Sequence, residues 1–190
     1  MTSSVSLLLI GDSGVGKTSL LHTFLNGEFP ANTVSTIGIN YMSRVVSVRD
    51  KSITLRLFDT GGQERFRSIT LSSFRQAQAV IFVFDVTNRS SFESMSSWIQ
   101  EAQSHCPENF QALIVGNKTD LTAQRVISTT QAEEFAVLKK MPYFDTSAKL
   151  NDSVVEVFET IADLCVSAQV ESCDSDETLN LLQRRSGCGC

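Results

Sequence analysis

The chain has 190 residues, of which 42% are hydrophobic, 19% are charged and three are prolines. This length and composition predict one globular domain with a substantial core, and they exclude a chain that is disordered throughout. The formal net charge of −5 argues against nucleic acid as a main partner, because a phosphate backbone requires a basic surface.

The sequence predicts neither a secretory signal nor a membrane span. The first six residues carry no basic side chain, and the apolar run Leu7–Ile10 is too short for a signal peptide. No apolar stretch approaches the roughly 18 residues that a membrane helix needs. The five cysteines form no regular framework, so we expect free thiols in a reducing, intracellular setting. Any contact with a membrane should then come from a group added to the chain.

Short apolar runs alternate with amphipathic stretches, which predicts βα repeats around a mainly parallel sheet. The expected strands are Val5–Ile10, Ile39–Val48, Ile53–Asp59, Ala79–Asp85, Ala112–Asn117 and Pro142–Asp145. The second and third are separated by the polar turn Arg49–Ser52, so this pair should be an antiparallel hairpin. The predicted fold class is α/β, with a six-stranded, mostly parallel sheet that contains one antiparallel hairpin strand.

About five helices are expected to flank the sheet. They are Lys17–Leu25, Gln63–Gln76, Ser90–Ser104, Gln131–Lys140 and Asp152–Gln169. Capping-box patterns, Ser90-x-x-Glu93 and Thr130-x-x-Glu133, are expected to open two of them. The apolar positions of the last helix recur at helical spacing and should lie in the core: Val154, Val157, Phe158, Ile161 and Leu164.

The composition changes after Val170. Residues 171–190 are acidic and rich in serine, and they contain no pattern that would bury one face. The sequence therefore predicts a folded domain over residues 4–170 and a flexible tail over residues 171–190.

The segment Gly11-Asp12-Ser13-Gly14-Val15-Gly16-Lys17-Thr18 fits the G-x-x-x-x-G-K-[ST] pattern of a phosphate loop, between a predicted strand and a predicted helix. Its glycines let backbone N–H groups surround a phosphate, and the helix N-terminus adds partial positive charge. Lys17 should neutralise β- and γ-phosphate oxygens, and the Thr18 hydroxyl should coordinate Mg²⁺. The predicted nucleotide contacts extend to Ser19. A plain glycine-rich turn is the alternative, and the motif does not specify the base.

A second motif, Asn117-Lys118-Thr119-Asp120, follows a predicted strand at the end where α/β folds bind ligands. The Asp120 carboxylate can accept hydrogen bonds from guanine N1–H and the exocyclic amine, whereas adenine would leave this carboxylate buried without partners. Asn117 should position the base, and the stem of Lys118 should lie over its face. A polar turn is the alternative for this motif alone.

A third motif, Thr146-Ser147-Ala148-Lys149, follows the next predicted strand, where the Ala148 N–H can meet guanine O6. The residues that we assign to the base from these two motifs are Asn117, Lys118, Asp120, Ser147, Ala148 and Lys149. Their order after the phosphate loop predicts a guanine nucleotide.

The segment that begins with Asp59 ends an apolar strand and continues as Thr60-Gly61-Gly62-Gln63. Asp59 should hold Mg²⁺ through its water shell, the Gly62 N–H should reach the γ-phosphate, and Gln63 should orient the attacking water. Thr36 should give a second hydroxyl to Mg²⁺ and its N–H to the γ-phosphate, so that one phosphate group orders both loops. An exposed loop threonine and a surface glutamine are the alternatives for Thr36 and Gln63.

No arginine of the predicted domain lies in an obvious position to reach the γ-phosphate. Arg65 and Arg67 are more consistent with solvent or a partner. We therefore expect slow intrinsic hydrolysis and an arginine finger from an activating protein, which contributes roughly 10³–10⁵-fold. The residues predicted to act in catalysis are Gln63, Lys17 and Thr36, and the predicted Mg²⁺ ligands are Thr18, Thr36 and Asp59.

With these motifs in place, the chain closely resembles the Rab family of Ras-like small GTPases over about residues 5–165. The resemblance rests on the phosphate loop, Ser35–Tyr41, Asp59–Thr70, Phe82–Thr87 and the two guanine motifs, in continuous order. It implies the P-loop NTPase G domain, with GTP or GDP and Mg²⁺ bound and Phe29 against the guanine. It also implies a monomer whose partners are effector proteins, an exchange factor, a GTPase-activating protein, a GDP-dissociation inhibitor and a prenylation escort.

The chain departs from this family at the switch segments. Gly61 stands where Rab proteins usually have alanine, and the extra glycine should loosen the loop. The aromatic triad of the Rab effector surface corresponds here to Tyr41, Phe58 and Ser73, so the usual effector preferences do not carry over.

The tail ends in Cys188-Gly189-Cys190, which matches the C-x-C ending of Rab proteins that take a geranylgeranyl group on Cys188 and on Cys190. Two lipids are expected because one gives only marginal membrane binding. The tail offers little electrostatic help, since four acidic residues oppose Arg184 and Arg185. A metal-binding or disordered cysteine pair is the alternative. The expected location is the cytoplasmic face of an intracellular membrane, with a cytosolic pool.

These motifs favour a regulatory GTPase, and the Rab resemblance implies that it acts in vesicle trafficking by recruiting effectors. A metabolic P-loop enzyme such as a nucleotide kinase is a second class, which the guanine motifs and the tail disfavour. A scaffold that binds GTP with little or no hydrolysis is a third, and Gly61 keeps it open.

Overall fold

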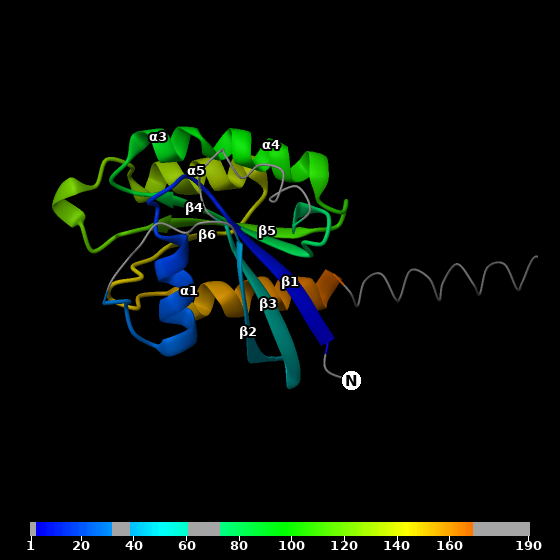
Figure 1. Cartoon of the computed structure of the whole chain (residues 1–190). Coiled ribbons are helices and arrows are strands. Elements are labelled where there is room, and N and C mark those ends of the chain that lie inside the picture. The colour runs from blue at the N-terminus through cyan, green and yellow to red at the C-terminus, as the bar shows by residue number, and fades with distance from the viewer. Residues whose placement is uncertain (1–2, 32–38, 61–72, 169–190) are drawn as a thin grey trace, which may run out of the picture.

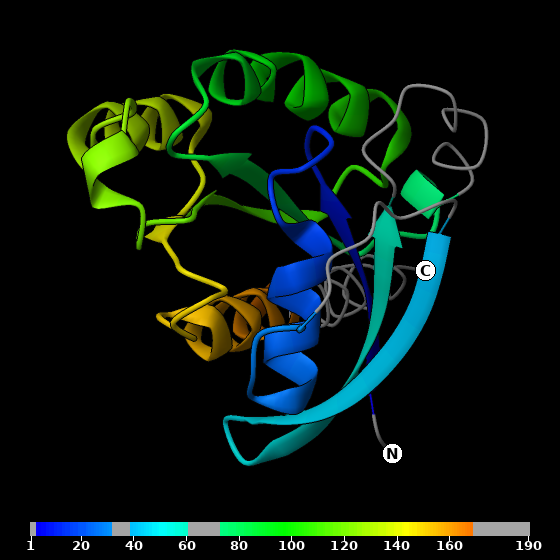
Figure 2. The same cartoon turned by 60° about the vertical axis from the view of Figure 1, so that its left-hand side comes forward.

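The structure, a computed structural model, describes residues 3–31, 39–60 and 73–168 (Figures 1 and 2). Within these ranges six strands form one sheet in the order β2-β3-β1-β4-β5-β6. The strands are β1 Ser3–Ile10, β2 Ile39–Val48, β3 Lys51–Thr60, β4 Ala79–Asp85, β5 Gln111–Asn117 and β6 Tyr143–Asp145. Only the pair of β2 and β3 is antiparallel among these neighbours, which confirms the predicted α/β sheet with one antiparallel hairpin strand.

Helices cover both faces of this sheet (Figure 1). α1 Lys17–Asn26 and a helix over residues 154–168 lie on one face. The other face carries α3 Arg89–Glu93, α4 Met95–His105 and α5 Thr129–Lys139. Most of the predicted helix Gln63–Gln76 and the whole predicted tail lie outside the described residues. No helix in the described ranges combines the length and the apolar character that crossing a membrane requires.

The sheet separates two apolar layers because successive strand residues point to opposite faces. In β1, Leu7 and Leu9 join the core under α1 and the helix over residues 154–168, whereas Leu8 and Ile10 join the core under α4 and α5. The predicted core positions of the last helix are confirmed at Val154, Val157, Phe158 and Ile161, which are buried, while Leu164 is partly buried.

The hairpin turn is shorter than predicted. Arg49 and Asp50 alone form it, because Lys51 pairs with Val48 and Ser52 pairs with Ser47 as part of β3. Both turn residues have positive φ, 47° and 62°, as a two-residue turn requires when it must match the right-handed twist of its strands. The predicted four-residue turn Arg49–Ser52 is therefore wrong at its second half.

The N-cap residues of both predicted capping boxes are also wrong, because each helix is capped two residues earlier in the chain than predicted. Asn88 caps α3 and accepts a hydrogen bond from Ser90 N–H at 3.0 Å, and Ser128 caps α5 and accepts from Gln131 N–H at 3.1 Å. The cap is the last residue with extended backbone, and Ser90 and Thr130 are already helical. The single predicted helix Ser90–Ser104 is divided at Ser94, where the Ser97 N–H bonds back three residues instead of four.

The two cysteines within the described residues, Cys106 and Cys165, are free thiols, as predicted. Burial raises the pKa of each to about 12, so both stay protonated near neutral pH and are poor nucleophiles.

Candidate nucleotide-binding site

The phosphate loop joins β1 to α1 at the carboxyl end of the parallel strands, as predicted. Two of its glycines are required by close approaches. A Cβ at Gly11 would lie 2.0 Å from the Val83 carbonyl oxygen, and one at Gly16 would lie 2.3 Å from Asn117 Nδ2. Gly16 also caps α1 with φ 99°, in the left-handed region. The loop therefore packs against β4 and β5 at a distance that only glycine permits.

Two adjacent side chains at the end of β5 hold carbonyl groups of this loop. Lys118 Nζ donates to the Gly14 carbonyl at 2.7 Å, and Asn117 Nδ2 donates to the Val15 carbonyl at 2.9 Å. In a planar trans peptide the following N–H points away from the carbonyl. Fixing these carbonyls thus turns N–H groups to the other side, where they can meet an anion. A phosphate fits this cradle.

Lys17 is the cation of the loop and is 5% exposed. Its Nζ donates to the carbonyls of Gly11 at 2.7 Å and Asp12 at 2.8 Å. Burial lowers the pKa of Lys17 to about 8, although the carboxylates of Asp59 and Asp12 oppose this shift. Negatively charged phosphate oxygens next to Lys17 would stabilise its ammonium form and raise its pKa again.

The predicted Mg²⁺ ligands Thr18 and Asp59 are brought together. Asp59 is fully buried in β3, and its Oδ2 accepts a hydrogen bond from Thr18 Oγ1 at 2.7 Å. A hydroxyl and a carboxylate are the oxygen ligands that Mg²⁺ prefers. The described part of the chain contains no cluster of three His, Cys, Asp or Glu side chains that would hold a metal by itself. The pair therefore fits Mg²⁺ that is shared with phosphate oxygens and water.

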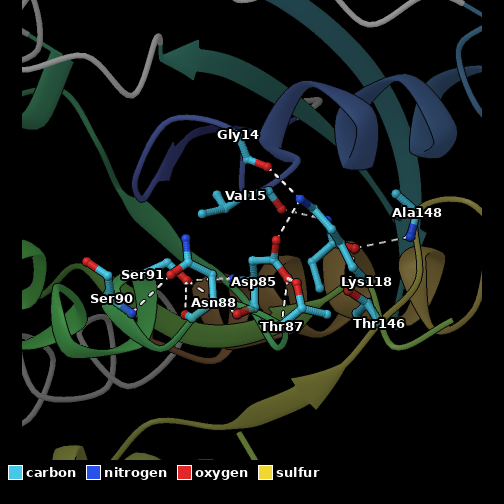
Figure 3. Close-up of polar contacts among 11 residues, drawn as sticks. Gly14, Val15, Asp85, Thr87, Asn88, Ser90, Ser91, Lys118, Thr146 and Ala148 are labelled. Atoms are coloured by element: carbon cyan, nitrogen blue, oxygen red, sulfur yellow. Dashed lines mark hydrogen bonds and ion pairs between the residues drawn. The ribbon is translucent and has the colours of Figure 1, made fainter. Parts of the chain in front are cut away.

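The two base motifs meet through Asn117, which is 1% exposed. Its Oδ1 accepts hydrogen bonds from Ala148 N–H at 3.2 Å and Thr146 Oγ1 at 3.4 Å. Asp120 Oδ1 accepts from Ser147 Oγ at 2.7 Å. Side chains thus join the loop after β5 to the loop after β6, and Figure 3 shows the backbone nitrogen of Ala148 directed toward the segment that carries Lys118. The Ala148 N–H, which we expected at guanine O6, lies against Asn117 in the structure.

The other predicted contacts differ in exposure, and some of them lie outside the described ranges. Ser13 and Lys149 are exposed, Ser19 is buried in the first turn of α1, and Phe29 follows α1 with 41% of its surface exposed. The predicted switch residues Thr36, Gly62 and Gln63 lie outside the described residues.

Two residues that sequence reasoning did not assign contact this site. Asp85, at the end of β4, forms an ion pair with Lys118, with 2.6 Å between Oδ2 and Nζ. Trp98 of α4 donates from Nε1 to Asp12 Oδ1 at 2.8 Å. Asp85 carries a recognisable signal, because it ends an apolar strand as Asp59 does. Trp98 carries none, since it reaches the loop only through the packing of α4.

The comparison with known protein families agrees with this geometry. The model of the Ras family matches residues 6–167, a stretch that runs from β1 through the phosphate loop and both base motifs. The chain belongs to the Ras family of small GTPases.

Proposed function

We propose that the chain is a Rab-type member of this family, a switch that cycles between GTP-bound and GDP-bound states on an intracellular membrane. The observation that supports this proposal is that three loops meet at one edge of the sheet: the phosphate loop, the loop after β5 and the loop after β6. Asn117 joins them directly, because its side chain donates to the Val15 carbonyl and accepts from the Ala148 N–H. The phosphate and base contacts are thus parts of one site.

Each part of this site has a role in binding. Lys17 and the N–H groups of the phosphate loop hold the phosphates, and Asp120 selects guanine over adenine. Thr18 and Asp59 hold Mg²⁺, which when bound neutralises charge on the phosphate oxygens. By resemblance, Thr36 and Gly62 contact the γ-phosphate and Gln63 orients the attacking water. Loss of the γ-phosphate then releases both segments, and effectors dissociate.

Hydrolysis should be slow without a partner. In the sequence no arginine of the domain stands in an obvious position to reach the γ-phosphate, so we assign that arginine to an activating protein. Single-turnover hydrolysis of loaded GTP, with and without a Rab-directed activating protein, tests this. Fast turnover by the purified chain alone would contradict it.

A GTP-binding scaffold with little hydrolysis is the second candidate, and Gly61 next to the segment that contains Gln63 keeps it open. Replacing Gly61 by alanine separates the two. A chain that hydrolyses GTP only after Gly61→Ala is a locked scaffold, whereas a switch hydrolyses it in both forms.

The proposed membrane attachment rests on Cys188 and Cys190, each of which we assign a geranylgeranyl group. An exchange factor, a GDP-dissociation inhibitor and a prenylation escort are the corresponding proposed partners. The proposed effector surface includes Tyr41 and Phe58, neighbours on β2 and β3 whose rings are tilted by 56° with centroids 5.5 Å apart. Ser73 in place of an aromatic residue gives this surface a selectivity of its own. The proposed process is vesicle trafficking.

A further inference from the structure

A buried carboxylate, Asp85, stands at the edge of the sheet that binds the nucleotide. Its side chain is only 10% exposed. A buried negative charge is unfavourable unless it is paired, and it is doubly so beside a site that must attract phosphates. Its presence there calls for a specific partner.

The two oxygens of Asp85 have separate partners (Figure 3). Oδ1 accepts hydrogen bonds from Thr87 N–H at 2.8 Å and Thr87 Oγ1 at 2.7 Å, which closes the turn after β4. Oδ2 faces Lys118 Nζ at 2.6 Å. One oxygen thus maintains a turn, and the other meets the lysine of the base motif.

The strand register makes the second contact possible. β4 and β5 are parallel neighbours, and Asp85 pairs with Asn117, the residue before Lys118. Lys118 itself has φ 71°, a left-handed conformation that is uncommon for a residue with a side chain. This conformation and this register bring the lysine back over the ends of the strands.

Lys118 in turn spans the site. Its Nζ also donates to the Gly14 carbonyl at 2.7 Å, so the ammonium lies between β4 and the phosphate loop (Figure 3). The contacts with Asp85 and Gly14 hold Nζ in place, and they therefore also hold the direction of the aliphatic stem. That stem is the part of Lys118 expected against the face of the guanine.

We propose that Asp85 is a positioning residue for guanine-nucleotide binding: its ion pair holds Lys118 so that the lysine stem forms one wall of the base pocket. The inference rests on the guanine-nucleotide binding of the proposed function and is independent of the membrane role. Asp85 acts on retention of both GDP and GTP. It does not act on the hydrolytic step, which belongs to the γ-phosphate and the Thr18–Asp59 end of the site.

Replacement of Asp85 by asparagine tests this with little change of shape. The Asn Oδ1 can still accept both bonds from Thr87, whereas the Nδ2 amide opposes the Lys118 ammonium, donor against donor. We expect the dissociation rate of a fluorescent GDP analogue to rise by about tenfold, as for loss of one charge-assisted contact. The single-turnover rate of hydrolysis of bound GTP should stay within about twofold.

Thr87→Val is the matched control, because it removes the bond from Oγ1 to Oδ1 and keeps the ion pair. Its GDP release should stay within about twofold of that of the unmodified chain. Lys118→Met keeps the aliphatic stem but loses the ammonium. As a single substitution, with Asp85 intact, it should release GDP faster than the unmodified chain does. Combining it with Asp85→Asn should then add almost nothing, because Lys118→Met already removes the ion pair that Asp85→Asn would remove.

Several results would overturn the inference. Unchanged GDP release in Asp85→Asn would do so, as would equal acceleration by Thr87→Val, which would assign the effect to the turn. If Asp85→Asn does not fold, the combined variant cannot be compared with the single ones, and the test then rests on Lys118→Met. Unchanged GDP release in Lys118→Met would overturn the inference. An unmodified chain that retains no guanine nucleotide would overturn the proposed function as well, whereas tight retention with unaffected variants overturns this inference only.

Discussion

Lys17 shows how a single buried charge links pH to ligand binding. Its pKa is lowered to about 8, chiefly by burial, so the free protein begins to lose this proton just above neutral pH. Phosphate oxygens favour the charged form and should raise the pKa again. Binding therefore pulls a proton onto Lys17 in the pH range between the two values.

We predict that GDP binding at pH 8 takes up about half a proton, because roughly half of the free protein is deprotonated at Lys17 there. The uptake should vanish near pH 6, where Lys17 is already charged. Calorimetric titration of nucleotide-free protein in two buffers of different ionisation enthalpy measures it. Lys17→Met should bind more weakly and without uptake, and equal uptake in that variant would place the proton elsewhere.

Trp98 has a similar indirect role at the phosphate loop. Its indole N–H holds the carboxylate of Asp12, whose carbonyl accepts from Lys17. Trp98→Phe keeps a ring in the core beside α4 and removes only the donor, so we predict roughly fivefold faster GDP release. Stopped-flow measurement of the release rate checks this. In an Asp12→Ala background the same substitution should have almost no further effect, and a full fivefold effect there would show that the hydrogen bond is not the cause.

Among the elements, α1 carries Lys17 and Thr18 and depends on apolar packing for its position. Phe24 of α1 stacks on Phe158 of the helix over residues 154–168, with ring centroids 4.0 Å apart, and both rings are 1% exposed. The hairpin is joined to the same helix by Arg49 and Asp163, whose side chains are 58% and 36% exposed. Water screens this ion pair, so the buried stack should dominate the stability.

We predict that Phe158→Ala lowers the free energy of unfolding by about 3–5 kcal/mol, through lost burial and the cavity that remains. Arg49→Gln should change it by less than about 1 kcal/mol. Urea unfolding of both variants, loaded with GDP at equal excess, gives the comparison. A larger loss for Arg49→Gln than for Phe158→Ala would reverse our ranking of the two contacts.

The elements were largely predictable from the sequence, and their ends were not. Apolar runs such as Ala79–Asp85 gave the strands because full burial on both faces leaves few alternatives. The predicted helix ends were wrong where several polar residues could serve as the N-cap, as at Asn88 and Ser90. The choice of cap depends on backbone angles that composition does not specify. The length of the turn at Arg49 and Asp50 was also predicted wrongly, because neither residue is the usual glycine or asparagine of a two-residue turn.

In the candidate site, the sequence motifs located the residues that contact one another locally or through an adjoining strand. Thr18 contacts Asp59, and Asp120 contacts Ser147, in the structure. The contribution of Asp85 depends on the register of β4 against β5, and that of Trp98 depends on how α4 packs. Neither register nor helix packing is encoded in a short motif, so these two residues emerge only from the fold.

At the scale of the whole molecule, the proposed lipid anchor would hold the nucleotide switch at a membrane. Expression in cells with an intact prenylation system should add two geranylgeranyl groups, which mass measurement of the intact chain detects. Replacing Cys188 and Cys190 together by serine should remove both groups and the membrane fraction of the protein. An unmodified mass for the natural chain would refute the anchor and leave the nucleotide site untouched.

The identity and fate of the bound nucleotide test the central claim most directly. The protein is purified with Mg²⁺, its nucleotide is released and identified, and loaded GTP is followed over hours. Bound GDP and slow conversion of GTP are the predicted results for a guanine-nucleotide switch of this family. A bound adenine nucleotide would contradict the assignment of Asp120 and the base motifs, and GTP that stays intact would contradict the switch.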